Sequence, residues 1–236
     1  MAIIVPKRII QYPKVRGKIQ AWLVDNNSGI AKTIHIKDYL SYKKNLTPNQ
    51  YLYDLASLGV GDTPDMELKY VGLSTAYDPP ERTSTLVMEK ARNVPTSVTR
   101  VNNKLIVEAK FESDVFTLFP NITGVTSTTV FTVDDATGLA VGQRIAVQLP
   151  GVARPEQRKI TNISTNTITV HFPFSVAPEI GTDNCMQMFS RLHLVYGASA
   201  TSSLNSGSGA SIAQILTTKL STQTIYTRHE IEYLAG

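Results

Sequence analysis

Apolar and polar residues alternate along several stretches of this chain, and alternation with a period of two is typical of half-buried β-strands. Residues 16–25 and 30–37 alternate on either side of the sequence DNNSG at 25–29. Asp, Asn, Ser and Gly favour tight turns, because they accept or stabilise the backbone conformations that a turn needs. We therefore expect a β-hairpin that joins residues 16–25 to residues 30–37.

The same alternation recurs later in the chain. Residues 98–101 and 105–111 flank Asn102-Asn103, and asparagine tolerates the left-handed backbone of a hairpin turn, so we expect a second hairpin here. Residues 225–231 predict a final strand with every second residue on one face. The expected fold class is mainly β, a β-sandwich-like body with one or two short helices.

A first helix is predicted over residues 47–58. Thr47-Pro48 supplies an N-cap followed by proline at the first helical position, apolar residues follow at helical spacing, and Gly59 ends the run.

A second short helix is predicted to follow the strand at 68–73. Hydroxyl residues at 83–85 can cap it, and Leu86, Glu89 and Arg92 fall three residues apart, which places them on one helical face. We expect Leu86 to point inward. Glu89 and Arg92 are candidate assembly contacts, at or beside a contact within the subunit or between subunits. As an exposed ion pair they would contribute only a few tenths of a kcal/mol, to an order of magnitude.

The composition changes near residues 120 and 188. Between them lie short Thr- and Val-rich strands separated by turns, which predict a small β-barrel or β-sandwich module inserted into the main domain. The main domain then comprises residues 1–119 and 189–236. Within its second part, the sequence SATSSLNSGSGAS at 199–211 predicts a flexible Ser/Gly loop.

Composition narrows the function classes. The chain has 236 residues, a formal net charge of +4 and one cysteine, Cys185, so no intrachain disulfide can form. The basic residues are scattered, which indicates a solvated face more than a nucleic-acid site. No apolar run is long enough for a membrane span, and the start of the chain lacks the features of a signal peptide.

Residues with catalytic or metal-binding spacing are not found. The four histidines lie in predicted strands without a metal-ligand pattern, and Cys185 is interpreted as a packing residue. Asp134 and Asp135 could help to hold calcium, but turn capping is the interpretation we favour, since adjacent strand-end side chains point apart. We therefore expect no enzyme activity, no cofactor and no metal site.

The order of these elements resembles a family of structural proteins from tailed bacteriophages, found at the starts of tail-fibre and collar proteins and in neck and baseplate components. Almost the whole chain outside 120–188 takes part. The counterparts are Lys18–Ile36, Asn45-Leu46-Thr47, Tyr70-Val71-Gly72, Thr83-Ser84-Thr85-Leu86 with Glu89 and Arg92, Leu105–Phe111, Leu194-Val195-Tyr196-Gly197, Lys219-Leu220 and Ile225–Tyr233. The family usually has an acidic residue before its glycine–leucine strand, where this chain has Arg191 and His193.

The resemblance implies a virion structural protein of the tail or neck, which assembles with copies of itself in a symmetric ring and with other tail, neck or head proteins. One alternative is a host-attachment protein whose inserted module binds a surface sugar. Its candidate aromatic residues are Phe131, Phe172 and Phe174. Another alternative is an accessory β-sandwich domain of a bacterial enzyme.

The first thirteen residues predict an extended arm. Ile3-Ile4 and Ile9-Ile10 form two apolar pairs between prolines, and these four isoleucines are candidate assembly contacts. We predict that a protease cleaves residues 1–13 faster in the free chain than in assembled particles, because such an arm becomes ordered only on its partner. Limited proteolysis read by mass spectrometry measures both rates, and equal rates would contradict the prediction.

Overall fold

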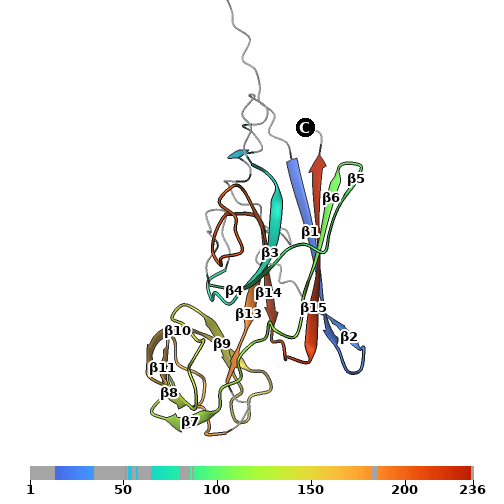
Figure 1. The fold of residues 1–236 in the computed structure, drawn as a ribbon. Helices are drawn as coiled ribbons and strands as arrows, with labels where there is room; N and C mark the ends of the chain where they lie inside the picture. Colours follow the sequence, from blue (N-terminus) through green and yellow to red (C-terminus); the bar gives the residue numbers. More distant parts are fainter. Residues whose placement is uncertain are drawn as a thin grey trace, which may run out of the picture.

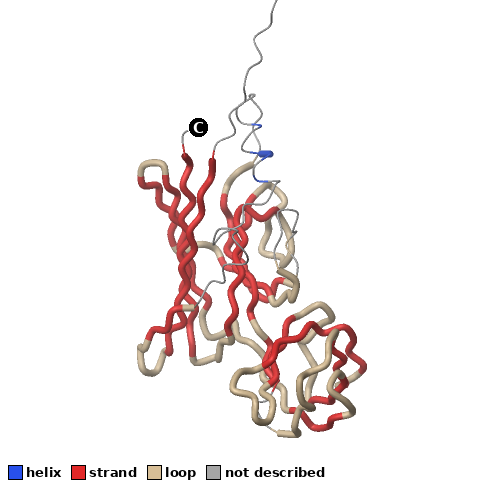
Figure 2. Tube along the Cα trace, turned by 180° about the vertical axis from the view of Figure 1, so that it is seen from behind, coloured by secondary structure: helices blue, strands red, loops and turns tan. Residues whose placement is uncertain are grey.

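The fold is mainly β, as predicted, and the described residues form three sheets (Figures 1 and 2). This computed structural model describes residues 14–34, 51, 53, 54, 57, 65–79, 86, 88–181 and 185–234. The strands are β1 (Lys14–Asp25), β2 (Ala31–Thr33), β3 (Leu68–Ser74), β4 (Glu89–Asn93), β5 (Ser97–Val101), β6 (Lys104–Phe111), β7 (Ile122–Val125), β8 (Val130–Val133), β9 (Arg144–Val147), β10 (Glu156–Ser164), β11 (Thr167–Val170), β12 (Cys185–Gln187), β13 (Phe189–Tyr196), β14 (Ser208–Thr217) and β15 (Gln223–Leu234).

The body consists of two sheets that pack face to face. The five-stranded sheet has the order β2-β1-β15-β6-β5, and the four-stranded sheet has the order β14-β13-β3-β4. β1 pairs with β15 in unbroken register from Lys14↔Leu234 to Asp25↔Gln223, which joins the two ends of the described chain. The apolar side chains between the sheets form one core, which includes Val71, Leu73, Val107, Phe111, Leu192, Leu194 and Ile225.

The third sheet is curled and has the order β12-β9-β10-β11-β8-β7, so its six strands come from one continuous part of the chain, residues 122–187. It encloses a separate apolar core that includes Phe131, Ile145 and Phe174. The two ends of the segment meet, because Gln187 N donates to Leu118 O at 2.8 Å. In Figure 1 this sheet lies at one end of the body.

Residues 75–78 of the body contact this third sheet directly. Arg144 N donates to Thr75 O at 2.7 Å, and the Arg144 guanidinium donates to Tyr77 O and lies 4.4 Å from the Tyr77 ring centroid. Lys159 forms an ion pair with Asp78 at 2.7 Å. The contact therefore includes hydrogen bonds, an ion pair and an edge-on packing of the Tyr77 ring against the His171 ring, with centroids 4.6 Å apart.

Both predicted hairpins are confirmed. β1 pairs with β2 across a turn in which Gly29 has a φ of +69°, and residues 35–37 of the predicted second strand lie outside the described residues. β5 pairs with β6 across Asn102, which has a φ of 54°. Residues 51, 53, 54 and 57 are helical, in agreement with the helix predicted over 47–58, whose other residues lie outside the described part.

The helix predicted to carry Leu86, Glu89 and Arg92 is wrong: residues 89–93 form strand β4, paired with β3. Leu73 faces Ala91 and Ser74 faces Glu89, so Lys90 has no residue opposite it. This extra residue is a β-bulge. In a regular strand, residues three apart point to opposite faces, but the bulge returns Glu89 to the face of Arg92. A β-bulge can therefore place residues three apart on the same face, as a helix does, and the helix interpretation did not consider this.

The Ser/Gly stretch is more ordered than its composition predicts. β14 begins at Ser208, so the second half of the stretch is strand. The first half, residues 201–206, is called the strap below, and it forms many hydrogen bonds to the sheet. Leu86, as expected, is buried, with 7% of its surface exposed, and it packs with Val195 and Ala200.

We predict that the body folds without residues 120–188. Because Leu118 and Gln187 are hydrogen-bonded neighbours, a short Gly/Ser linker between residues 119 and 189 can bridge the deletion without moving either strand. The variant should keep the far-UV circular dichroism of a β-protein and melt cooperatively, at a lower temperature because the contacts of residues 75–78 are lost. An insoluble or non-cooperative variant would contradict the insertion.

We predict an acid-sensitive body core because of His229. This histidine is fully buried on the core-facing side of β15, and neither ring nitrogen has a hydrogen-bond partner in the described part of the chain. Burial, together with the nearby His193, lowers the pKa of His229 from 6.5 to about 3. Below pH 6.5 the unfolded chain therefore binds a proton on this histidine that the folded chain does not bind. The free energy of unfolding falls as the pH is lowered, by about 2 kcal/mol from pH 7 to pH 5.

The test compares the free energy of unfolding of the wild type and His229→Leu in urea at pH 7, 6 and 5. The leucine variant should lose about 2 kcal/mol less over this range. Other titrating groups affect both chains alike, so the difference isolates His229. An identical pH dependence in the two chains would show that the ring is not held neutral.

Candidate functional site

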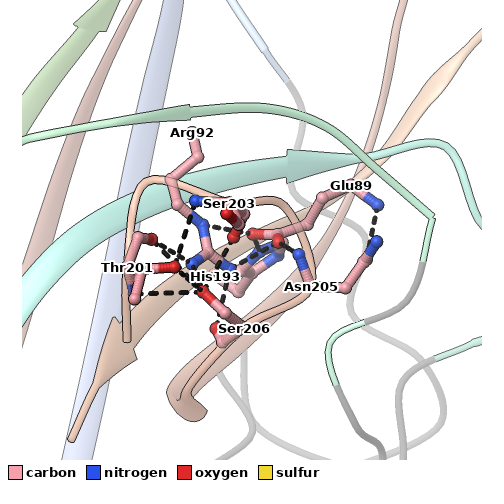
Figure 3. A network of polar contacts seen from close by, with 7 residues as sticks. All are labelled: Glu89, Arg92, His193, Thr201, Ser203, Asn205 and Ser206. Carbon is pink, nitrogen blue, oxygen red and sulfur yellow. Dashed lines mark hydrogen bonds and ion pairs between the residues drawn. The ribbon is translucent and has the colours of Figure 1, made fainter. Parts of the chain in front are cut away.

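The charged residues singled out from the sequence meet on the outer face of the four-stranded sheet (Figure 3). Gly72 of β3 stands opposite Arg92 of β4 on one side and His193 of β13 on the other. An added Cβ at Gly72 would lie 2.1 Å from His193 Nε2 and 2.4 Å from Glu89 Oε1. Glycine at this position therefore creates the space in which the two flanking strands bring their polar side chains together.

Glu89 is the centre of this cluster. Its Oε1 accepts hydrogen bonds from Arg92 Nε at 3.2 Å and from His193 Nε2 at 2.6 Å. Its Oε2 accepts from Arg92 Nη2 at 2.5 Å and from the backbone N–H of Asn205. Two carboxylate oxygens thus hold four donors, and the Arg92 contact is the bidentate geometry that makes arginine–carboxylate pairs strong.

Arg92 links the sheet to the strap. Besides Glu89, its Nη1 donates to Thr201 O at 2.8 Å and to Ser206 Oγ at 2.7 Å, and its Nη2 donates to Ser206 O at 2.9 Å. These contacts use all five N–H donors of the guanidinium group. Tyr70 lies under the same group, with its ring centroid 5.4 Å from Arg92 Cζ.

The strap itself is shaped to meet these donors. Asn205 returns a hydrogen bond through its Oδ1, which accepts from Glu89 N at 3.1 Å, so the two residues bond reciprocally. Asn205 has a left-handed backbone, with a φ of 62°. Ser206 Oγ accepts from Thr201 N at 3.0 Å and donates to Ser203 O at 2.7 Å, which closes the strap on itself. We call Glu89, Arg92, His193 and Asn205 the clamp.

The ionised groups of the clamp are buried, and their charges balance each other. The side chains of Glu89 and Arg92 have no exposed surface, and that of His193 is 2% exposed. Burial alone would raise the pKa of Glu89, but the bonds from His193 and Arg92 hold that pKa below its ordinary value. Burial lowers the pKa of His193, and the bond to Glu89 opposes this only in part. His193 is therefore neutral, and because an ionised carboxylate only accepts, His193 Nε2 carries the proton.

This arrangement stabilises a loop and offers no exposed reactive group. A carboxylate, a histidine and an arginine in contact resemble catalytic groups, but the protein itself supplies partners for both Glu89 oxygens, for every N–H of Arg92 and for His193 Nε2. The contact of Glu89 and Arg92 lies within the subunit, which is one of the two placements that the sequence allowed. Ile3, Ile4, Ile9 and Ile10, the other candidate assembly contacts, lie outside the described residues.

The remaining candidate residues have structural roles. Asp135 caps its turn as favoured, because its Oδ1 accepts from Thr137 N at 2.8 Å, whereas Asp134 accepts from Asn121 N at 2.9 Å, thirteen residues earlier in the chain. Cys185 is fully buried, and burial raises its pKa to about 12, as a packing residue requires. Among the described residues, no three His, Cys, Asp or Glu side chains are grouped so that they could hold a metal. Within that same part of the chain, no helix has the length and apolar character needed to cross a membrane.

The comparisons add no relative. The chain matches no protein-family model, no curated protein and no solved structure.

Sequence reasoning found Glu89 and Arg92 but missed their partners. His193 lies 104 positions from Glu89 and Asn205 lies 116 positions away, and no local pattern connects them. The one available signal was Arg191 and His193 on β13, at a place where the phage family that the sequence resembles usually has an acidic residue. A histidine on that strand needs an acceptor, and Glu89 of β4 supplies one across Gly72.

We predict that Gly72→Ala destabilises the body by about 1–3 kcal/mol, the usual cost of forcing a methyl group into a filled site. Gly72 does not have a positive φ, so the effect is steric. The matched control is Gly124→Ala on β7, where the new Cβ would meet nothing closer than Thr132 at 3.6 Å. Thermal melting of both variants measures the difference, and equal melting temperatures would show that the space beside Gly72 can accept a methyl group.

We also predict that Arg92→Ala destabilises the body by about 3–5 kcal/mol, because it leaves the Glu89 carboxylate buried without its cation. This replaces the small cost expected for an exposed pair. The control is Lys110→Ala, which breaks the Lys110–Glu112 pair, 2.6 Å long with side chains 44% and 59% exposed. That change should cost less than about 1 kcal/mol. Urea unfolding measures the loss of unfolding free energy in both variants, and similar losses would contradict a buried clamp.

Proposed function

We propose that this chain is a structural component of a tailed-bacteriophage virion, in the tail or the neck, and that it acts through protein–protein assembly. The observation that supports this best is the clamp. The buried carboxylate, arginine and histidine of the clamp fix the strap on the sheet. This polar cluster therefore gives the surface at the strap a defined shape. Shape-defined surfaces are what repeated, symmetric contacts require.

The element order that resembles the phage structural family is the second support. Two of its motif residues, Glu89 and Arg92, hold the clamp together, although they lie on strand β4 and not on the helix that the resemblance implies, and a third, Gly72, makes room for it. In this proposal the partners are copies of the same chain in a ring, together with other tail, neck or head proteins, and the chain is located in the virion.

Particles provide the test. An antibody against this chain, applied to purified virions and viewed by negative-stain electron microscopy, should label the tail or the neck. Mass photometry of the isolated chain, alone and with tail proteins, should show complexes with the tail proteins. Virions that contain no copy of the chain by mass spectrometry would overturn the proposal.

A host-attachment role is a second candidate, and one aromatic residue favours it. Phe131 and Phe174 are buried, but Phe172 is 64% exposed. Arg158 fixes its turn by donating to Phe172 O at 3.2 Å and to Pro173 O at 2.7 Å, so the ring is displayed on a rigid support. If this role holds, the chain should bind host surface polysaccharide in a sedimentation assay and Phe172→Ala should abolish binding. No binding by the wild type would exclude it.

A further inference from the structure

Strand β5 is an edge strand with little protection. It is the outermost strand of the five-stranded sheet, and no other strand of the described residues pairs with its free side (Figure 1). Its five residues pair with β6 in continuous register, from Ser97↔Glu108 to Val101↔Lys104, without a bulge. Edge strands in monomers usually carry a bulge, a proline, lysines or a cover, because free backbone groups attract another strand. Within Ser97–Val101 there is no bulge, proline or lysine, and Arg100 is the one charged side chain of the kind that protects an edge.

Apolar side chains mark the same edge. Val94 is 67% exposed, Val98 is 52% exposed and Val101 is 46% exposed. Val98 and Val101 point to opposite faces of the strand, so both faces of the edge are apolar. Val98 stands beside Val107, which has no exposed surface. On the core-facing side of the sheet, the valine of β6 is therefore buried, whereas the valine of β5, one strand further out, is exposed.

The opposite edge of the sheet is different. Within the described residues, β2 spans three residues, Ala31–Thr33, and very short edge strands resist pairing. The two edges therefore differ in the way expected if only the β5 side meets another strand.

We propose that β5 pairs with β5 of a second copy of this chain, antiparallel and centred on Thr99. In this register Ser97 faces Val101 of the other copy and Val98 faces Arg100. All five residues of both strands take part, and the two arginines are kept apart, each beside a valine. A pair centred on Arg100 would place like charges directly opposite each other, which is destabilising. A pair centred on Val98 would bring in Pro95, which has no backbone N–H to donate.

The interface is small. Five residues on each side bury far less than the roughly 1,600 Å² of a standard stable interface. The dimer is therefore weak and depends on concentration, and it matters where copies are held side by side. The pair is isologous, so it can join two copies or two rings but cannot itself close a ring, and the inference goes beyond the proposed function. Its test uses the isolated chain, so a negative result leaves the placement in the virion unaffected.

Sedimentation velocity over a range of protein concentrations tests the pairing. The wild type should shift from monomer to dimer, and Val98→Lys should weaken the association at least tenfold, because the new lysine faces Arg100 of the other copy. Adding Arg100→Glu to that variant should restore association, since the lysine at 98 then faces a glutamate across the two-fold axis. Ile30→Lys, at a site 70% exposed beside β2, is the matched control and should associate like the wild type.

Each outcome decides. A wild type that stays monomeric at every concentration would overturn the inference, and so would a Val98→Lys variant that associates normally. If Val98→Lys is monomeric but the double variant is too, the register centred on Thr99 is wrong. If Val98→Lys melts below the wild type, Thr99→Lys replaces it, because the register places the two new lysines directly opposite each other, and the same loss of association is expected.

Discussion

An ionised carboxylate that is shut away from water must have its oxygens fully hydrogen-bonded, and Glu89 imposes this constraint on the body of the protein. Its four donors come from three places in the chain: β4 itself, β13 and the strap. The bulge in β4 aims Glu89 and Arg92 to the same side, and Gly72 leaves the space between them and His193. The strap then covers what would otherwise be an exposed charged face of the sheet.

The clamp shows why a Ser/Gly-rich loop can be ordered. Composition alone makes residues 201–206 costly to fix, since small polar residues bury little apolar surface. Here the order comes from hydrogen bonds to charged groups, which are stronger than neutral ones. Arg92 contributes three of them to the strap, and Glu89 and Asn205 add a reciprocal pair. The loop is therefore held by the sheet beneath it.

The parts of the fold that depend on nearby residues could be predicted from the sequence. Both hairpins follow from alternation beside asparagine and glycine turns, and the buried face of β15 follows from the spacing of Ile225, Thr227, His229 and Ile231. The helix at 83–94 failed because pairing with β3 overrode local propensity, and a bulge reproduced the spacing of a helix. Only Glu89 and Arg92 of the clamp could be predicted, because His193 on β13 and Asn205 in the strap lie more than a hundred residues from Glu89 in the sequence.

The central claim is that buried charge fixes the strap on the sheet, and amide hydrogen exchange of the strap measures this directly. In the wild type, the amides of Thr201 and Asn205 bond to Ser206 Oγ and Glu89 Oε2, so they should exchange as slowly as amides in β13 and β14. In Glu89→Gln, where the charge is removed and the shape is kept, the strap should lose protection while β1 and β15 keep theirs. Strap amides that exchange at the rate of a free loop in the wild type would contradict the account.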